Sequence, residues 1–452
     1  MLFLKIILGL FGLGIVVFVH ELGHFLAARL TGIDVEAFSI GWGRPILKKK
    51  IGAVEYRLGM FPLGGYCKMK GENEFREAWE NRKNETGPEP GSFFAAGPVR
   101  RIIVSFAGPL FNLLFAVLVL SFIWGLGFEI ETLSNRIVLA SEINRGQHFP
   151  ADEAGLRTGD RIIEINGRNT PYYHNVQENI AVNPEKLLSL TVDRDGEILR
   201  ISVRPNLDKK TGAGKIGVYF WTDPVIDKVT EGGPAMAAGL MAGDRILRAN
   251  GEPVLHSVDF LGLLADKPSL LVLDYERNGV ERQARLIPLY SEDGEAMLGI
   301  SYGTIRYRTP ALSFPASLAK GVGEAWKTLV VSLQSLSLLF KGIDLTQAVS
   351  GPVRITYMVG DVAAEGFGQS FADGIRSMTD FLALISIALC IMNLLPLPIL
   401  DGGMIVLFTI ELIKRKPLNP RFIAVFQTLG AILIFGLMIF AVFGDILYLA
   451  RR

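Results

Sequence analysis

Four long apolar stretches dominate the pattern of hydrophobic and polar positions along this 452-residue chain. Because a helix needs roughly 20 apolar residues to cross the ~30 Å hydrocarbon core of a bilayer, each stretch predicts a transmembrane helix. The first shows no small-residue cleavage site of a secretory signal, so we expect it to be retained. The four stretches are about Leu2–Val19, Ile102–Phe128, Phe381–Leu395 with its flanks, and Phe422–Phe443.

The polar region between the second and third stretches contains an internal repeat. Residues 150–167 recur as residues 234–251, with an offset of 84 at every matched position. Each copy combines strand patterns with an Asn-Gly turn, which predicts two small β-rich domains rather than a solenoid. We expect these domains to cover residues 129–221 and 222–309.

Two further segments have patterns of their own. In residues 38–70, glycines separate short β-prone runs, which predicts hairpins rather than helix. The apolar surface of this segment favours a loop that re-enters the membrane edge, with an ordinary cytoplasmic hairpin as the alternative. An amphipathic stretch at 313–340 favours a helix on the outer membrane surface, within a segment 310–376. The membrane spans then lie in residues 1–128 and 377–452.

The distribution of charge predicts the orientation in the membrane. The formal net charge is +1, and neither a basic stripe nor zinc-finger spacing suggests nucleic-acid binding. Lys and Arg residues crowd the loop between the first two spans and the loop Lys414–Arg421 between the last two, so the positive-inside rule places both loops in the cytoplasm. Both termini and the repeat region are then expected in the periplasm. Cys67 and Cys390 lie outside that region, which therefore needs no disulfide.

The chemistry of the chain is concentrated where the first apolar stretch ends. His20-Glu21-Leu22-Gly23-His24 is an H-E-x-x-H motif, in which two histidines one helical turn apart face a single metal and a glutamate lies beside it. In zinc hydrolases such a glutamate takes a proton from a water whose pKa the metal lowers to ~7. Ionisable residues in a membrane helix mark a functional site, although a chance match is the alternative.

The third ligand is expected to be a carboxylate. The chain has five histidines, and His148, His174 and His256 lie in the polar repeat region. Asp401 follows two prolines that break the third span, and it falls at the same cytoplasmic depth as the first motif. A His₂Asp set with one open position suits catalytic zinc. Asp380 and Glu411 are alternatives without the broken-helix setting.

Together these motifs resemble the site-2 protease family of intramembrane zinc metalloproteases. The resemblance rests on H-E-L-G-H, Phe61–Tyr66, the A-G-P-x-x-N of the second span and the N-x-x-P-x-P-x-x-D-G of the third. It implies His20, His24 and Asp401 as ligands of Zn²⁺, Glu21 as general base, and Asn393 as a hydrogen-bonding partner of the substrate backbone. It also implies that Gly41–Met69 is a re-entrant β-loop holding the substrate as a strand. Gly41, Gly43, Pro396 and Pro398 are expected to bind the substrate as well. Met404 replaces a histidine found in some relatives.

The repeats resemble PDZ domains of bacterial envelope proteases, in a circularly permuted order. This resemblance implies carboxylate-binding loops that take up peptide C-termini, at Ile216, Gly217 and Val218 and at Leu298, Gly299 and Ile300. A spacer or size filter without a ligand is the equal alternative. The expected fold is thus a polytopic α-helical protein of the bacterial inner membrane with four transmembrane helices, a re-entrant β-hairpin loop and two tandem periplasmic PDZ domains.

The family resemblance also implies the substrates, which are single-span membrane proteins. They would include an anti-sigma factor already trimmed by a first protease, in envelope-stress signalling, and remnant signal peptides. Two competing hypotheses remain: a membrane-anchored protease cutting soluble proteins at the cytoplasmic surface, and a membrane-tethered PDZ scaffold with a vestigial metal site. The intact Glu21 argues against the scaffold, because a vestigial site needs no base.

Overall fold

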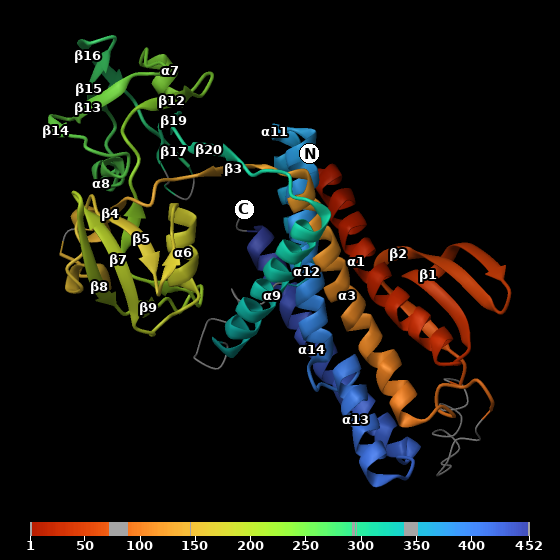
Figure 1. Cartoon of the computed structure of the whole chain (residues 1–452). Coiled ribbons are helices and arrows are strands. Elements are labelled where there is room, and N and C mark those ends of the chain that lie inside the picture. The colour runs from red at the N-terminus through yellow and green to blue at the C-terminus, as the bar shows by residue number, and fades with distance from the viewer. Residues whose placement is uncertain are drawn as a thin grey trace. The chain divides into compact units, whose positions relative to one another are not determined.

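The computed structural model describes residues 2–71, 89–144, 146–291, 294, 296–338 and 351–450. The chain forms two compact units (Figure 1). The first, which we call the helical unit, comprises Met1–Phe128 and Pro310–Arg452, and the second, the β-rich unit, comprises Glu129–Thr309. The β-rich unit is thus inserted between the second and third long apolar helices of the helical unit.

The four predicted spans are confirmed as helices. They are α1 (Leu2–Leu30), α3 (Pro98–Leu126), α12 (Phe371–Leu394) and α14 (Pro420–Ala450). Within the described residues, these four are long and apolar enough to cross a membrane. α3 packs against both α1 and α12, so it lies at the centre of the helical unit (Figure 1).

Three other helices pack against these spans: α9 (Phe314–Leu338), α11 (Pro352–Gln369) and α13 (Asp401–Lys414). The predicted amphipathic helix is α9, which runs along α3 with Ala325 and Ala116 buried between them. α11 crosses α1 closely, since a Cβ at Gly9 would lie 2.0 Å from the Thr356 carbonyl oxygen. The membrane-surface position of the 310–376 segment stays a prediction.

A long hairpin, β1 (Val35–Ile51) and β2 (Val54–Met69), follows α1. Both strands bend, so that Ala37 of β1 pairs with Lys68 on one side and with Glu55 on the other. Phe38 packs against Phe25 of α1 with ring centroids 5.3 Å apart, which fixes the hairpin to the helix. The prediction of hairpin structure here was correct.

The β-rich unit consists of two similar halves, as the repeat predicts. Each half has a four-stranded sheet, in the order β6-β5-β7-β8 in the first half and β14-β13-β15-β16 in the second. The first strand of the unit, β3 (Glu129–Thr132), pairs with its last strand, β20 (Ile305–Arg308). The first half contains β4 (Ile137–Leu139), β5 (Arg161–Ile165), β6 (Arg168–Asn169), β7 (Leu188–Arg194), β8 (Glu197–Val203), β9 (Asn206–Leu207), β10 (Gly214–Lys215), β11 (Val218–Phe220), α4 (Ala140–Ile143), α5 (Pro150–Glu153) and α6 (Tyr173–Ala181). The second contains β12 (Ile226–Val229), β13 (Arg245–Ala249), β14 (Glu252–Pro253), β15 (Leu271–Arg277), β16 (Val280–Leu286), β17 (Leu289–Tyr290), β18 (Ala296–Met297), β19 (Ile300–Tyr302), α7 (Pro234–Ala237) and α8 (Asp259–Leu264).

The repeated Gly-Asp pair of the sequence has the same structural role in both halves. Asp160 accepts hydrogen bonds from Arg194 at 2.8 Å, and Asp244 accepts them from Arg277 at 2.6 and 2.7 Å. Each arginine also bonds the carbonyl of the preceding glycine turn. Both aspartates are almost completely buried, so these charges are fully paired inside each half.

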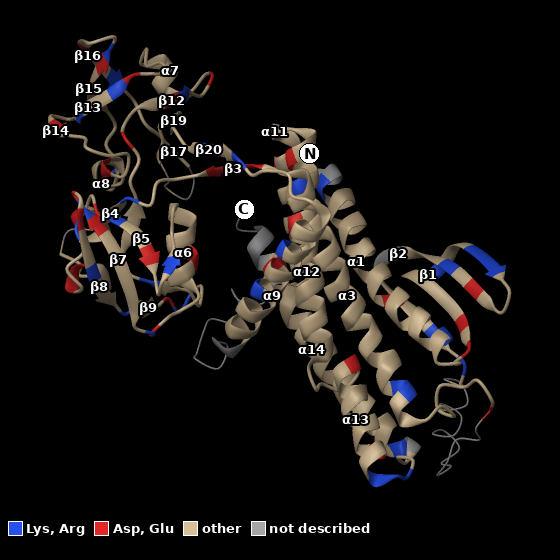
Figure 2. Ribbon diagram, viewed as in Figure 1, with Lys and Arg blue, Asp and Glu red and all other residues tan. Residues whose placement is uncertain are grey.

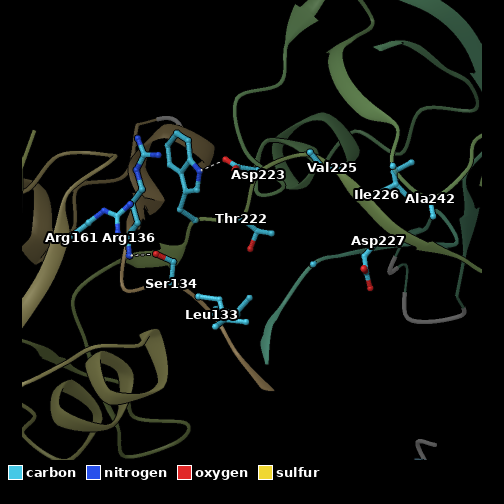
Figure 3. A pocket seen from close by; sticks show the side chains of 14 residues that line it. Leu133, Ser134, Arg136, Arg161, Thr222, Asp223, Val225, Ile226, Asp227 and Ala242 are labelled. Carbon is cyan, nitrogen blue, oxygen red and sulfur yellow. Dashed lines mark hydrogen bonds between the residues drawn. The ribbon is translucent and has the colours of Figure 1, made fainter. Parts of the chain in front are cut away.

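The linker between the halves is held by side chains from both of them. The Arg136 guanidinium lies 3.7 Å from the centre of the Trp221 ring, and the His256 ring lies 4.8 Å from it. Trp221 also donates a hydrogen bond to Asp223 (Figure 3). Arg136, Trp221 and Asp223 border a cleft of about 760 Å³.

Candidate metal centre

Two imidazoles and a carboxylate converge where α1 meets the start of α13. The Nε2 atoms of His20 and His24 lie 3.2 Å apart, and the Asp401 carboxylate oxygens lie 3.3 Å from His20 Nε2 and 3.5 Å from His24 Nε2. All the potential ligand atoms lie within 4.8 Å of one another. Residues distant in sequence thus form a group that could hold a metal ion.

The close approach of the two Nε2 atoms is itself an argument for a cation. His24 Nδ1 lies 2.8 Å from the Val104 carbonyl oxygen, an acceptor only, so Nδ1 carries the proton and Nε2 presents a lone pair. A lone pair facing a second imidazole and a carboxylate is stabilised by a shared positive ion. Two nitrogens and one oxygen form the donor set of a catalytic zinc site with an open position. The residues therefore fit Zn²⁺.

The loop between α12 and α13 positions Asp401. Pro396 and Pro398 prevent the helix from continuing, and Ile399 has φ = 78°, a left-handed conformation that β-branched residues rarely adopt. The first turn of α13 packs directly on this loop. A Cβ at Gly403 would lie 2.1 Å from the Leu397 carbonyl oxygen, and one at Gly402 would lie 2.3 Å from that of Leu394. The two glycines after Asp401 are therefore required by close packing.

The α3 helix supports the histidines from the other side. A Cβ at Gly23 of α1 would lie 2.4 Å from the Ala107 carbonyl oxygen, so the two helices touch at their backbones. At the next residue, Gly108, a Cβ would lie 2.4 Å from His24 Nε2. The A-G-P segment thus leaves room for the imidazoles and for an ion between them.

Asn112 is a site residue whose role the sequence did not reveal. It is completely buried, and its amide nitrogen lies 3.3 Å from His20 Nδ1. Its Oδ1 has no hydrogen-bond partner among the described residues. The amide O and N can be interchanged, so a rotated amide would let Asn112 Oδ1 accept a hydrogen bond from the Nδ1–H of His20. This gives the oxygen a partner and leaves His20 Nε2 for the metal. The A-G-P-x-x-N spacing, one turn beyond Gly108, was the available signal.

The hairpin brings backbone to Glu21. The Cys67 backbone hydrogen-bonds to the Glu21 carboxylate, and a Cβ at Gly65 would lie 3.1 Å from Glu21 Cγ. In the described pairing, 65–69 bond β1 on one side only, whereas 55–58 are paired on both sides. The outer strand beside Glu21 is therefore the later segment of β2. Gly41 and Gly43, both at positive φ, lie at the bend of β1.

Asn393 also lies at the centre, with Nδ2 3.4 Å from His20 Nε2. It belongs to the last turn of α12, and the proline loop that follows leads directly to Asp401. The alternative acids are engaged elsewhere. Glu411 forms a buried ion pair with Arg101, and Asp380 lies 3.6 Å from Arg376.

The residues expected to bind peptide ends lie in the β-rich unit. Ile216, Gly217 and Val218 line a groove of about 630 Å³ that also borders α6. The carbonyl of Ile216 accepts from Ala151 N–H, and that of Leu298 accepts from Ala235 N–H, so the two loops are held alike. Gly299 has φ = 71° and Ile300 begins β19. Tyr173 of α6 donates to the Val218 carbonyl at 3.0 Å across the groove.

Comparisons with known proteins agree with this centre. A model of peptidase family M50 matches residues 8–437. The chain is 37% identical over 447 residues to a Treponema pallidum protein whose name describes it as a zinc metalloprotease, covering 99% of both chains. It is 31% identical to the regulator of sigma-E protease RseP of Escherichia coli, covering 96% of both, and 31% identical to the regulator of sigma E protease of Haemophilus influenzae, covering 97% of both. The chain therefore belongs to peptidase family M50, the site-2 protease family, and is a zinc metalloprotease.

Proposed function

We propose that this metalloprotease cleaves peptide bonds within the transmembrane segments of single-span membrane proteins. The observation that carries the proposal is that His20 and His24 lie on α1, a helix long and apolar enough to span a bilayer, and that Asp401 at the start of α13 completes their cluster. A protease of soluble proteins has no need to place two ligands on such a helix, where ionisable residues are costly. This argues against cleavage at the cytoplasmic surface.

Each residue of the centre has a distinct role in the proposal. His20, His24 and Asp401 hold Zn²⁺, which supplies a Lewis acid and lowers the pKa of a water to ~7. Glu21 accepts a proton from the attacking water and returns it to the leaving amine. Asn393, 3.4 Å from His20, holds the substrate carbonyl or amide with its two-sided amide group.

The substrate segment must be unwound before it reacts, because a helix shields its own peptide bonds. The freed N–H and C=O groups then need partners, since each left unpaired in lipid costs several kcal/mol. We assign this role to the outer segment of β2, Gly65–Met69, which lies beside Glu21. Gly41, Gly43, Pro396 and Pro398 border the same path. The hairpin then acts as the re-entrant loop of the family.

In the proposed orientation both termini and the β-rich unit are periplasmic and the centre lies towards the cytoplasm of a bacterial inner membrane. Lys and Arg residues gather at the hairpin and around the end of α13 (Figure 2), which supports a cytoplasmic location of both. A membrane-impermeant thiol reagent should label Cys67 in inverted vesicles but not in spheroplasts. Labelling in spheroplasts would reverse the orientation.

The two halves of the β-rich unit act as PDZ domains in this proposal. The groove between α6 and the Ile216–Val218 loop supports peptide uptake by strand addition. The hydrogen bond from Tyr173 to Val218 closes that strand edge, which equally suits a filter that admits only trimmed substrates. Excess free C-terminal peptides should inhibit cleavage in the first case and have no effect in the second.

The biological substrates proposed are a trimmed anti-sigma factor and remnant signal peptides, in line with relatives named as regulators of sigma-E protease. The test is a comparison of membrane proteomes from cells carrying wild type or Glu21→Gln. Single-span fragments lacking their periplasmic domains should accumulate in the variant. Identical proteomes would refute intramembrane cleavage and favour the scaffold alternative.

A further inference from the structure

An apolar pocket lies between α1 and the β1–β2 hairpin, on the side of α1 away from the metal centre. It has a volume of about 770 Å³, within the range of ligand-binding pockets. Phe18, Leu22 and Phe25 line it from α1, at the spacing of one helix face. His20 lies roughly 200° around the helix from Phe18, so this pocket is separate from the substrate path.

The sheet lines the opposite wall with apolar side chains that share one face. Phe38 and Ile40 pair with Tyr56 and Leu58, and all four border the pocket. Phe38 is 5% exposed and Phe25 is 7% exposed, whereas Leu58 is 39% exposed and Leu47 is 66% exposed. The pocket thus has a buried aromatic floor and a mouth of exposed leucines. Water fills such an apolar space poorly, because it finds few polar partners there.

One cation faces the same mouth. Lys48, Lys49 and Arg57 also line the pocket, and the hairpin tip stands out as basic (Figure 2). Lys49 pairs with Tyr56 and so points to the pocket face, whereas Lys48 pairs with Arg57 on the opposite face of the sheet. Lys49 forms no salt bridge within the described part of the chain, so its charge is available at the rim. Lysine stems can lie along apolar surface while the ammonium reaches a polar headgroup.

From this combination we propose that the pocket is a binding site for one anionic phospholipid. An acyl chain occupies the aromatic floor between α1 and the sheet, and the lipid phosphate pairs with Lys49. A zwitterionic lipid could fill the floor but would lack the net charge that complements the rim. Because the other edge of the hairpin carries the Cys67 contact to Glu21, the bound lipid holds the hairpin against α1 without entering the reaction path.

The test measures lipid retention by native mass spectrometry of the full-length, zinc-loaded protein in detergent. The probes are phosphatidylglycerol and phosphatidylcholine with identical acyl chains. Wild type should retain one phosphatidylglycerol in preference to phosphatidylcholine. The variant Lys49→Gln should lower this preference by roughly five-fold. The matched control Lys48→Gln removes the same charge on the opposite face of the same strand and should keep the preference.

A second variant separates the contribution of the lipid acyl chain from that of the headgroup. Leu58→Trp fills the mouth without changing charge, and it should lower retention of both lipids; Leu47→Trp serves the same purpose if Leu58→Trp does not yield zinc-loaded protein. The proposal is overturned if both lipids are retained equally by wild type, which indicates annular lipid only. It is also overturned if Lys49→Gln matches the Lys48→Gln control, or if the filled pocket retains lipid as wild type does.

Discussion

Gly108 of α3 and His24 of α1 lie so close together that a Cβ on residue 108 would stand 2.4 Å from His24 Nε2. The same Cβ would lie 2.8 Å from His20 Cε1. One glycine therefore determines whether both imidazoles can keep their positions. The metal centre depends on the packing of α3 as much as on its ligands.

We predict that Gly108→Ala lowers both zinc occupancy and cleavage. The methyl group must displace a histidine or part the helices, and overpacking of this kind typically costs ~1–3 kcal/mol. Zinc content of the purified variant, measured by inductively coupled plasma mass spectrometry, checks this. Gly14→Ala is the matched control, because no atom lies within 4 Å of a Cβ there. Full zinc occupancy in Gly108→Ala would show that the site tolerates the displacement.

Asn112 should support metal binding through His20. Removing a partner of a ligating histidine typically weakens metal affinity about 10–100-fold, and we expect this of Asn112→Ala. Asn112→Asp keeps an acceptor for Nδ1–H and should retain more affinity. Competition with a zinc chelator gives the affinities. If the two variants bind zinc equally, the residue serves packing alone.

The buried Asp244–Arg277 pair should make the second half of the β-rich unit sensitive to acid. Burial opposes ionisation of Asp244, but hydrogen bonds from Arg277 and Met241 N–H hold the pKa of the carboxyl below its usual 3.8. A lowered folded pKa contributes stability that is present above pH ~4 and is lost as pH falls through the folded pKa. Asp244→Asn should therefore destabilise this half at pH 7, and the difference from wild type should shrink at more acidic pH.

Hydrogen exchange of β13 and β15 in the full chain, at pH 7 and below pH 4, measures this difference. Asp266→Asn is the control, since Asp266 is exposed. A constant difference between Asp244→Asn and wild type at both pH values would mean that the ion pair is not the cause.

Substrate helices that unwind easily should be cleaved fastest. Gly, Pro, Ser or Asn near the cut lowers the cost of opening the helix, so such a segment reaches the β2 edge and Asn393 more often. A panel of reporter substrates in proteoliposomes, with uninterrupted Leu as reference, gives the relative rates. Equal rates across the panel would place the limiting step elsewhere.

Much of this architecture could be predicted because local patterns determine it. Apolar length alone identified α1, α3, α12 and α14, and the 84-residue repeat identified two similar halves. H-E-x-x-H selected His20 and His24 because helical spacing puts them on one face. Asp401 was preferred to Glu411 and Asp380 because it follows a helix broken by prolines. Of these three acids, the structure brings only Asp401 to the histidines.

The rest depends on contacts between segments far apart in sequence. The A-G-P-x-x-N motif singles out Asn112 but does not identify its partner, His20, which lies 92 residues away in the sequence. The pairing of Ala37 with both Lys68 and Glu55 arises from bends in β1 and β2. The sequence therefore could not show that 65–69 is the outer strand beside Glu21 and that 55–58 is an interior strand. Likewise, the pocket behind α1 exists only because the hairpin folds back along that helix.

The central claim is that three residues hold the metal while a fourth moves the proton. Its most direct test is zinc stoichiometry together with cleavage of a single-span substrate, for purified Glu21→Gln and Asp401→Ala. We predict that Glu21→Gln retains zinc but loses at least about 10²-fold in rate, whereas Asp401→Ala loses zinc and activity together. Asp401→Ala with full zinc and full activity, or Glu21→Gln with wild-type activity, would contradict the account.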